Sequence, residues 1–215
     1  MKLVSVNVGL PREVEWRGEM VLTSIFKTPV PGRVRVRGLN LEGDRQSDLA
    51  VHGGKDKAIY VYPSEHYPFW KRELPGTELP WGAFGENLTT EGILEADACI
   101  GDRIRCGSAE FMVTQPRMPC SKLGIRFGRP EMVGRFARSR RTGFYLAVLR
   151  EGEVAAGDPL ELVAPEGDRI SVADVVRIFA SDEADDGLLR RASELAALPE
   201  GWRRRFRARL QAAKA

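Results

Sequence analysis

The feature that most constrains the fold is a series of short strand-like segments, separated by glycine and proline, that runs from the N-terminus to about residue 163. Val4, Val6 and Val8 alternate with polar residues, which is typical of a half-buried strand. The segments 22–27, 33–37, 58–62, 100–106, 110–114, 144–149 and 159–163 have similar patterns. A closed sheet removes the exposed edges that so many short strands would leave. We therefore predict a mainly β domain over residues 1–163, built as a closed or partly closed β-barrel with few helices, at 64–74 and 130–138.

The pattern changes at Ser171, where Ser171 and Asp174 resemble a capping box. Apolar residues then follow the spacing of an amphipathic helix. Two further helices are predicted over 186–197 and 200–213. Because three short helices bury little surface alone, we expect them to pack together and against the barrel. The sequence thus predicts a small three-helix domain over residues 170–215, after a linker over 164–169.

Composition and patterning exclude several classes of function. A net charge of +3 is too small to indicate nucleic-acid binding, and the arginines at 203–205, 207 and 209 alternate with apolar residues as on a solvated helix face. No apolar run approaches the roughly 18 residues of a membrane span. The strand-like N-terminus lacks the apolar core of a signal peptide. We therefore predict a cytoplasmic protein that binds neither nucleic acid nor membrane.

Among the three cysteines, Cys120 is the candidate for chemistry. It follows Pro119 and lies between the basic residues Arg117 and Lys122, and Ser121 is a candidate cap for a helix that begins there. Positive charge and a helix start favour thiolate and lower the thiol pKa below its reference of about 8.5. An ordinary loop cysteine is an equally good interpretation. Cys99 and Cys106 flank a strand-like segment and are predicted to be small core residues.

Each of the other candidate residues is, by itself, only a weak indication of a binding or catalytic role. His52 precedes two glycines and is suited to bind an anion or shuttle a proton, although a structural loop histidine is as common. Lys27 and Arg45 are suited to phosphate or carboxylate, with a solvated lysine and an internal salt bridge as the alternatives. Glu86 and Asn87 follow a glycine and either line a pocket or form an ordinary turn. His66, among aromatic residues, is predicted to be structural.

Signatures of several common enzyme classes are absent. The sequence has no glycine-rich phosphate loop, no HExxH zinc motif and no GxSxG nucleophile elbow. A cysteine hydrolase that uses Cys120 and His52 would need an orienting Asn or Asp, and no such residue stands out.

Together these segments resemble the MOSC family, a domain related to the C-terminal part of molybdenum cofactor sulfurase, and within it the YiiM-type bacterial proteins. The tail is similar to the small three-α-helix domain of that type. The motifs that carry the resemblance occur in the family's order over residues 1–163: Lys27–Val30, Gly43–Gln46, Asp48, His52–Gly54, Phe84–Leu88, Gly101–Asp102 and Gln115–Cys120.

The resemblance implies a barrel-like fold and a site for the molybdenum cofactor (molybdopterin), with Cys120 as the ligand of molybdenum. It implies reduction of N-hydroxylated compounds such as hydroxylaminopurine-type base analogues, and so their detoxification. A family association with pyridoxal phosphate is part of the same expectation. Cys120 and His52 are then the expected catalytic residues. The cofactor-binding residues expected from it are Lys27, Thr28, Arg45, His52, Glu86, Asn87 and Arg117.

The partners that the resemblance implies are a small N-hydroxylated substrate and a separate electron-donor protein, because related proteins with a fused iron–sulfur domain have extra cysteines that this chain lacks. A homodimer is left open. Two other roles compete with reduction. In one, Cys120 carries a persulfide for sulfur transfer; in the other, the protein binds the cofactor without turnover.

Overall fold

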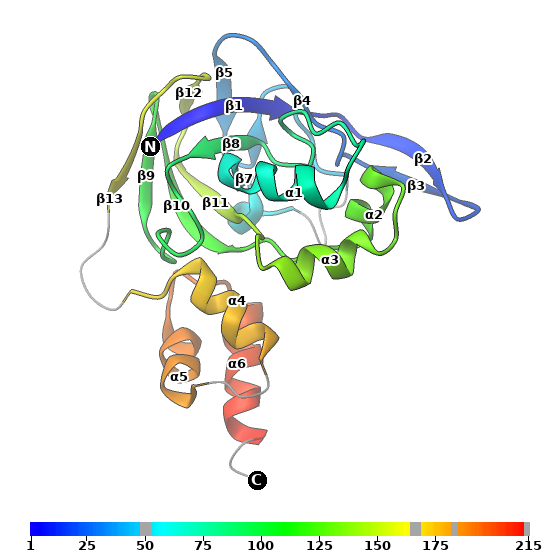
Figure 1. Cartoon of the computed structure of the whole chain (residues 1–215). Coiled ribbons are helices and arrows are strands. Elements are labelled where there is room, and N and C mark those ends of the chain that lie inside the picture. Colours follow the sequence, from blue (N-terminus) through cyan, green and yellow to red (C-terminus); the bar gives the residue numbers. More distant parts are fainter. Residues whose placement is uncertain (48–52, 164–168, 182–184, 213–215) are drawn as a thin grey trace.

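The computed structural model describes residues 1–47, 53–163, 169–181 and 185–212, and its elements are arranged as in Figure 1. The strands are β1 (Lys2–Val8), β2 (Arg12–Trp16), β3 (Glu19–Thr23), β4 (Thr28–Pro29), β5 (Val34–Arg37), β6 (Asn40–Leu41), β7 (Ile59–Pro63), β8 (Leu88–Glu91), β9 (Arg103–Cys106), β10 (Ala109–Pro116), β11 (Phe144–Arg150), β12 (Gly152–Val154) and β13 (Leu160–Val163). The helices are the 3₁₀ turns η1 (Lys55–Lys57) and η2 (Ser64–His66), and α1 (Tyr67–Glu73), α2 (Ser121–Phe127), α3 (Met132–Ser139), α4 (Val172–Ala180), α5 (Asp186–Glu194) and α6 (Glu200–Ala212).

An eight-stranded sheet dominates the fold, in the order β13-β9-β10-β11-β7-β8-β1-β4. Its pairings are antiparallel except between β7 and β8, which run parallel. The start of β1 approaches the chain before β13, where Lys2 forms a bridge with Pro159 and the amide of Leu3 donates to Asp158 at 2.9 Å. The predicted sheet-dominated fold is confirmed. The pairings within the described ranges contain this short contact and no continuous ladder that closes a barrel.

Strand β7 separates the two apolar clusters of the molecule. All five of its residues are buried, and because side chains alternate between the faces of a strand, Ile59 and Val61 enter the main core. Tyr60 and Tyr62 point to the opposite face and join an aromatic cluster with residues of α1, α2 and α3. In Figure 1 these three helices lie together on one side of the sheet. The aromatic cluster forms the support of the site described below.

Two local predictions for the N-terminal strands were wrong. The segment 22–27 is not one strand, because β3 ends at Thr23 and the next four residues have no regular structure. Ser24, Ile25 and Lys27 are all buried, which a half-buried strand with alternating exposure does not allow. The strand β2 was missed: Val14 and Trp16 alternate with glutamates, but the strand is only five residues long and largely exposed. Arg17 and Gly18, both with positive φ, connect it to β3.

The C-terminal helices share the main core with the sheet. Val172, Ile178, Leu189 and Phe206 belong to the same buried cluster as the strands, and the amide of Val172 donates to the carbonyl of Ala98 at 2.9 Å. The capping box of α4 is present as predicted. Three helices that pack together and against the sheet are therefore confirmed. No helix in the described part of the chain is long and apolar enough to cross a membrane.

Candidate functional site

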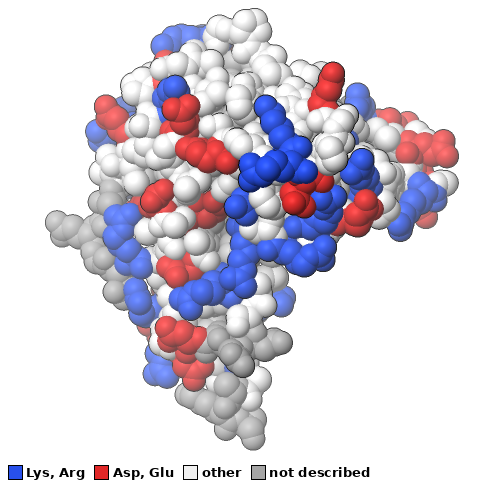
Figure 2. All heavy atoms as spheres, in the orientation of Figure 1, with Lys and Arg blue, Asp and Glu red and all other residues white. Residues whose placement is uncertain are grey.

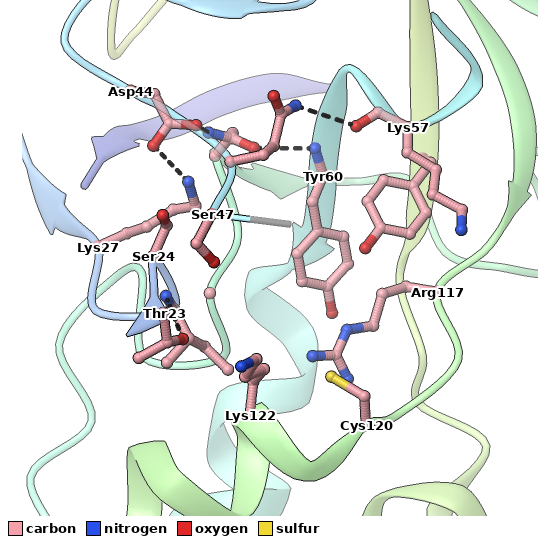
Figure 3. Close-up of a pocket in the computed structure, with 15 residues that line it drawn as sticks. Thr23, Ser24, Lys27, Asp44, Ser47, Lys57, Tyr60, Arg117, Cys120 and Lys122 are labelled. Atoms are coloured by element: carbon pink, nitrogen blue, oxygen red, sulfur yellow. Dashed lines mark hydrogen bonds and ion pairs between the residues drawn. The ribbon is translucent and has the colours of Figure 1, made fainter. Parts of the chain in front are cut away.

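A cavity opens between the loop after β3, strand β7 and the start of α2, as Figure 3 shows. Its volume is about 90 Å³, which is enough for a small group or several water molecules. A larger ligand would have to extend beyond its rim. Four of the predicted site residues line it together: Lys27, Asn87, Arg117 and Cys120.

Two glycines position the loop that carries Lys27. Gly82 has a φ of +85°, and a Cβ there would lie 2.8 Å from the carbonyl oxygen of Lys27. Gly85 has a φ of +83°, and a Cβ there would lie 2.8 Å from Ile25. Because glycine alone allows both the positive φ and the close approach, the 82–85 turn packs directly against residues 25–27. This contact brings the amine of Lys27 into the interior.

The amine of Lys27 forms a buried ion pair with Asp44, in which the two side chains are 8% and 1% exposed. Asp44 also accepts hydrogen bonds from the amide of Gly9 at 2.8 Å and from Nδ2 of Asn87 at 2.9 Å. Oδ1 of Asn87 in turn accepts from the amide of Tyr60 at 3.1 Å. Burial lowers the pKa of Lys27, and Asp44 acts in the opposite direction. These contacts join the residue after β1, strand β7 and the three loops that carry Lys27, Asp44 and Asn87 at one wall of the cavity.

Arg117 and Cys120 form the opposite wall. The Arg117 guanidinium is packed between aromatic rings, 5.5 Å from the centroid of Tyr60 and 5.3 Å from that of Phe136. Arg117 is buried, and its Nη1 has no hydrogen-bond partner. Burial acts to lower the pKa of Arg117, but Tyr60, the Cys120 sulfur and Tyr145 together raise it. Figure 3 shows the sulfur beside this guanidinium.

The helix start at Cys120 differs by one residue from the prediction. Cys120 itself is the N-cap of α2, with extended backbone and no side-chain cap hydrogen bond, and Ser121 is the first helical residue. Ser121 therefore does not cap the helix as expected. The carbonyl of Cys120 accepts from the amide of Leu123 at 3.0 Å. Its half-buried side chain lines the cavity, whereas Cys99 and Cys106 are buried core residues as predicted.

The structure places the other predicted site residues elsewhere. Glu86 is fully buried and does not line the cavity. Its carboxylate accepts from Tyr67, from Thr89 at 3.0 Å and from the amides of Gly82 and Phe84. Burial raises the pKa of Glu86. Thr28 and Arg45 are exposed and lie outside the cavity lining. His52 and Asp48 lie outside the described residues.

Several cavity residues were missed by the sequence reading. Tyr60 and Tyr145 lie opposite each other on the paired strands β7 and β11, with ring centroids 5.4 Å apart, and burial raises the pKa of each. Nothing in their local sequence separates them from core tyrosines. Lys57 was detectable as a cation close to the Gly53–Gly54 pair. Lys122, which the sequence analysis named only as a basic neighbour of Cys120, also lines the cavity, and its amine donates to the carbonyl of Leu22 at 3.0 Å.

These residues offer no all-protein metal cage. Within residues 1–47, 53–163, 169–181 and 185–212, no three or more His, Cys, Asp or Glu side chains converge to hold a metal. They offer instead one thiol on the cavity wall, basic side chains and an unpaired guanidinium nitrogen. A cofactor that brings its own soft metal ligands and anionic groups fits this donor set, because thiolate suits such a metal and cations suit phosphate. Fold and site thus define a sheet-dominated protein with an accessible cysteine in an open basic cavity.

Comparison with known proteins gives the family. The family model of the MOSC domain matches residues 48–161, and that of the YiiM-like 3-alpha helix domain matches residues 170–213. The chain therefore belongs to the MOSC domain family. It is 44% identical to the uncharacterized protein YflK of Bacillus subtilis over 95% of this chain and 92% of that one. It is 38% identical to protein YiiM of Escherichia coli over 87% of this chain and 84% of that one.

Two further relatives bear on architecture and on activity. The crystal structure of YiiM from Geobacillus stearothermophilus is similar with a TM-score of 0.80 at 35% identity, and the match covers 97% of this chain and 98% of that one. A protein of Gibberella moniliformis named reductase is 31% identical over 90% of this chain and 35% of its own length. In that protein, a region like this chain is part of a longer polypeptide.

Proposed function

We propose that this protein is a molybdenum-cofactor oxidoreductase that reduces N-hydroxylated compounds, such as hydroxylaminopurine-type bases. The observation that carries the proposal is the pairing of the Cys120 sulfur with a buried Arg117 whose Nη1 is unpartnered, at an open basic cavity. Membership of the MOSC family and the similarity to a protein named reductase support it.

In this proposal, Cys120 is the protein's ligand to the metal, because a soft thiolate suits a metal that is also held by sulfur. Arg117, Lys122 and Lys57 all line the cavity, and their positive charges would attract the anionic groups of the cofactor. The Lys27–Asp44 pair and Asn87 shape the facing wall. Pyridoxal phosphate usually attaches to an available lysine amine, which neither Lys27, paired with Asp44, nor Lys122, whose amine donates to the carbonyl of Leu22, offers in this structure.

The net reaction consumes two electrons and two protons. The N–O bond breaks, the oxygen leaves with the bonding pair and is protonated to water, and the nitrogen takes up the two supplied electrons and the second proton. When bound, the cofactor supplies the two-electron redox chemistry. Among the described residues that line the cavity, Nη1 of Arg117 and Oγ of Ser24 are buried donors with no partner of their own, so each is suited to donate a hydrogen bond to the hydroxyl oxygen.

The electrons come, in this proposal, from a separate donor protein. The region of the relative named reductase that matches this chain covers 35% of that protein. Figure 2 shows Lys and Arg side chains gathered over the side of the molecule that carries α1 and α3. Lys71, Arg72, Arg138 and Arg140 are exposed there. An acidic donor would be attracted to such a surface.

The test is metal content and activity of protein made in cells with intact cofactor biosynthesis. We expect the wild type to contain molybdenum and pterin and to reduce hydroxylaminopurine with a chemical electron donor. Cys120→Ser should lose both properties, while Cys99→Ala, at a buried cysteine outside the cavity, should keep both. Full activity of Cys120→Ser would contradict the proposed role of Cys120. A persulfide on Cys120 in molybdenum-free protein would favour sulfur transfer, and tight cofactor binding without reduction would favour a storage role.

A further inference from the structure

A second hollow lies where the 3₁₀ turn η1 faces the C-terminal helices. This hollow, the η1–α6 groove, has a volume of about 530 Å³ and is lined by residues of both regions. It is much larger than the cysteine cavity, which measures about 90 Å³. The groove therefore offers the room that the cavity lacks.

Two aromatic side chains, Phe179 of α4 and Trp202 of α6, line the groove on the side of the C-terminal helices. Nε1 of Trp202 donates to Oε1 of Gln115 at 2.7 Å, and the Trp202 ring lies 5.1 Å from that of Phe179. Nε2 of Gln115 donates to the carbonyl of Asp56 at 3.0 Å. A chain of contacts thus connects η1 through β10 to α6 and α4. Because these contacts join elements from both sides, the groove is a built feature rather than a gap between loosely placed parts.

The charge of the groove is positive. Among the described residues, three cationic side chains line it, those of Lys55, Lys57 and Arg205, together with the carboxylate of Asp56. The Arg205 guanidinium lies 4.3 Å from the centroid of the Phe179 ring, which orients it along the wall. Lys55 and Arg205 are both exposed and approach the groove from opposite sides. Such a pair of cations, one from η1 and one from α6, is suited to a phosphate group.

Lys57 connects the two sites. It lines both the cysteine cavity and the η1–α6 groove. In Figure 3 its carbonyl oxygen faces the interior and its amine is directed away. A ligand that occupied both spaces would pass Lys57, with its reactive end in the cavity and its anionic tail on the side of the lysine amine. A free base would leave the groove empty.

We infer that the η1–α6 groove binds the phosphate of a nucleotide, and that the reducible substrate is an N-hydroxylated nucleotide whose N–OH group enters the cysteine cavity. The second part rests on the proposed function; the first part does not, because it requires neither metal nor turnover. A phosphate on the cofactor itself shares the same chemistry, and the experiment separates these two sources.

The experiment measures binding of adenosine 5′-monophosphate, adenosine and inorganic phosphate to cofactor-free protein by calorimetry. We expect the nucleotide to bind at least about tenfold more tightly than adenosine, a difference of about 1.4 kcal/mol, and to weaken as ionic strength rises. Arg205→Glu and Lys55→Glu should each remove most of this preference. Arg204→Glu, an exposed neighbour on α6 outside the groove lining, is the matched control and should keep it.

The use of two variants from opposite walls guards against a folding artefact, because Lys55→Glu cannot disturb the contact of Arg205 with Phe179. Equal binding of nucleotide and adenosine, or equal losses in Arg204→Glu and Arg205→Glu, would overturn the inference. Nucleotide binding that disappears when the protein is loaded with cofactor would assign the groove to the cofactor's own phosphate and would also overturn it.

A second readout tests whether the base reaches the cysteine. Saturating adenosine 5′-monophosphate should slow alkylation of Cys120 by iodoacetamide several-fold, with the buried Cys99 and Cys106 as internal references in the mass spectrum. Inorganic phosphate at the same concentration should not protect. Nucleotide binding without protection of Cys120 would show that the groove is separate from the cavity and would contradict the proposed substrate. If instead the protein binds no molybdenum but passes both tests, the proposed reductase function fails and the nucleotide site stands.

Discussion

Asp44 illustrates how a residue that is absent from the expected binding set can be essential to the site. It holds the buried Lys27 amine and accepts from Gly9 and Asn87. Asp44→Asn would leave a buried cation without its counter-charge. We expect a loss of about 3–5 kcal/mol in the free energy of unfolding, measured by urea denaturation. The exposed neighbour Glu42 provides the control Glu42→Gln, which should change stability little, and a loss below about 1 kcal/mol in Asp44→Asn would show that the pair is not structural.

Arg117 is predicted to control the reactivity of Cys120. The two groups interact electrostatically, and a buried cation beside a sulfur favours its ionised, reactive form. Arg117→Met keeps a long apolar side chain between Tyr60 and Phe136 and removes the charge. We expect alkylation of Cys120 by iodoacetamide at pH 7 to slow by about tenfold, which corresponds to about 1.4 kcal/mol. Arg126→Met, which removes a half-buried cation of α2 outside the cavity lining, should react like the wild type; equal rates in all three proteins would exclude the proposed coupling.

At the level of elements, Glu95 joins three parts of the chain. Its carboxylate contacts Nε2 of His66 in η2 at 2.9 Å and accepts from the amide of Gly143 at 2.7 Å. Its backbone carbonyl accepts from Ala173 in α4 at 2.8 Å. Gly143 precedes β11, and its carbonyl accepts from the amide of Arg117 at 3.2 Å. The carboxylate thereby supports the loop on which Arg117 stands.

The same carboxylate predicts a dependence of stability on pH. Burial alone would raise the pKa of Glu95, but His66 and the Gly143 amide outweigh it, so the folded-state pKa is lowered. Its stabilisation is therefore complete above the unfolded-state pKa and is lost as pH falls through the folded-state pKa. We expect Glu95→Gln to lower the free energy of unfolding by about 1.5–3 kcal/mol at pH 7.

Urea denaturation of wild type and Glu95→Gln between pH 7 and pH 3 measures this effect. The difference between the two proteins should shrink as pH falls, because only the wild type loses a favourable charge. Glu78→Gln, at an exposed carboxylate, should show no such convergence. A difference that stays constant with pH would contradict a charged role for Glu95.

At the scale of the whole molecule, the sheet and the C-terminal helices form one apolar cluster. Phe206 of α6 is fully buried in it. We expect the chain to unfold in one cooperative transition, seen at the same urea concentration by far-UV circular dichroism and by tryptophan fluorescence. Phe206→Ala should lower the free energy of unfolding by about 3–5 kcal/mol and shift both signals together. A variant in which the helical signal is lost first would show that the two regions unfold independently.

Much of this organisation could be predicted from the sequence, because it depends on patterns among neighbouring residues. The turn residues and the two-residue period predicted a mainly β region, and the spacing of Val172, Val175 and Val176 after Ser171 predicted α4. Prediction failed at two places: the short β2, in which Val14 and Trp16 alternate with charged residues, was missed, and Ser24, Ile25 and Lys27 are buried without alternation. Those residues take their conformation from the 82–85 turn packed against them, a contact that no local pattern encodes.

By itself, the sequence determined the classes of element, the change from sheet to helix and the candidacy of Cys120, because periodicity, turn chemistry and a charged thiol environment are properties of neighbouring residues. Only the tertiary structure decided which candidates meet. Lys27, Asn87, Arg117 and Cys120 line one cavity. Glu86 is buried and does not line it, and Thr28 and Arg45 are exposed outside it. The physical reason is that the site is assembled from residues as far apart as Lys27 and Tyr145, and their proximity follows from strand order and from the faces that β7 and β11 present.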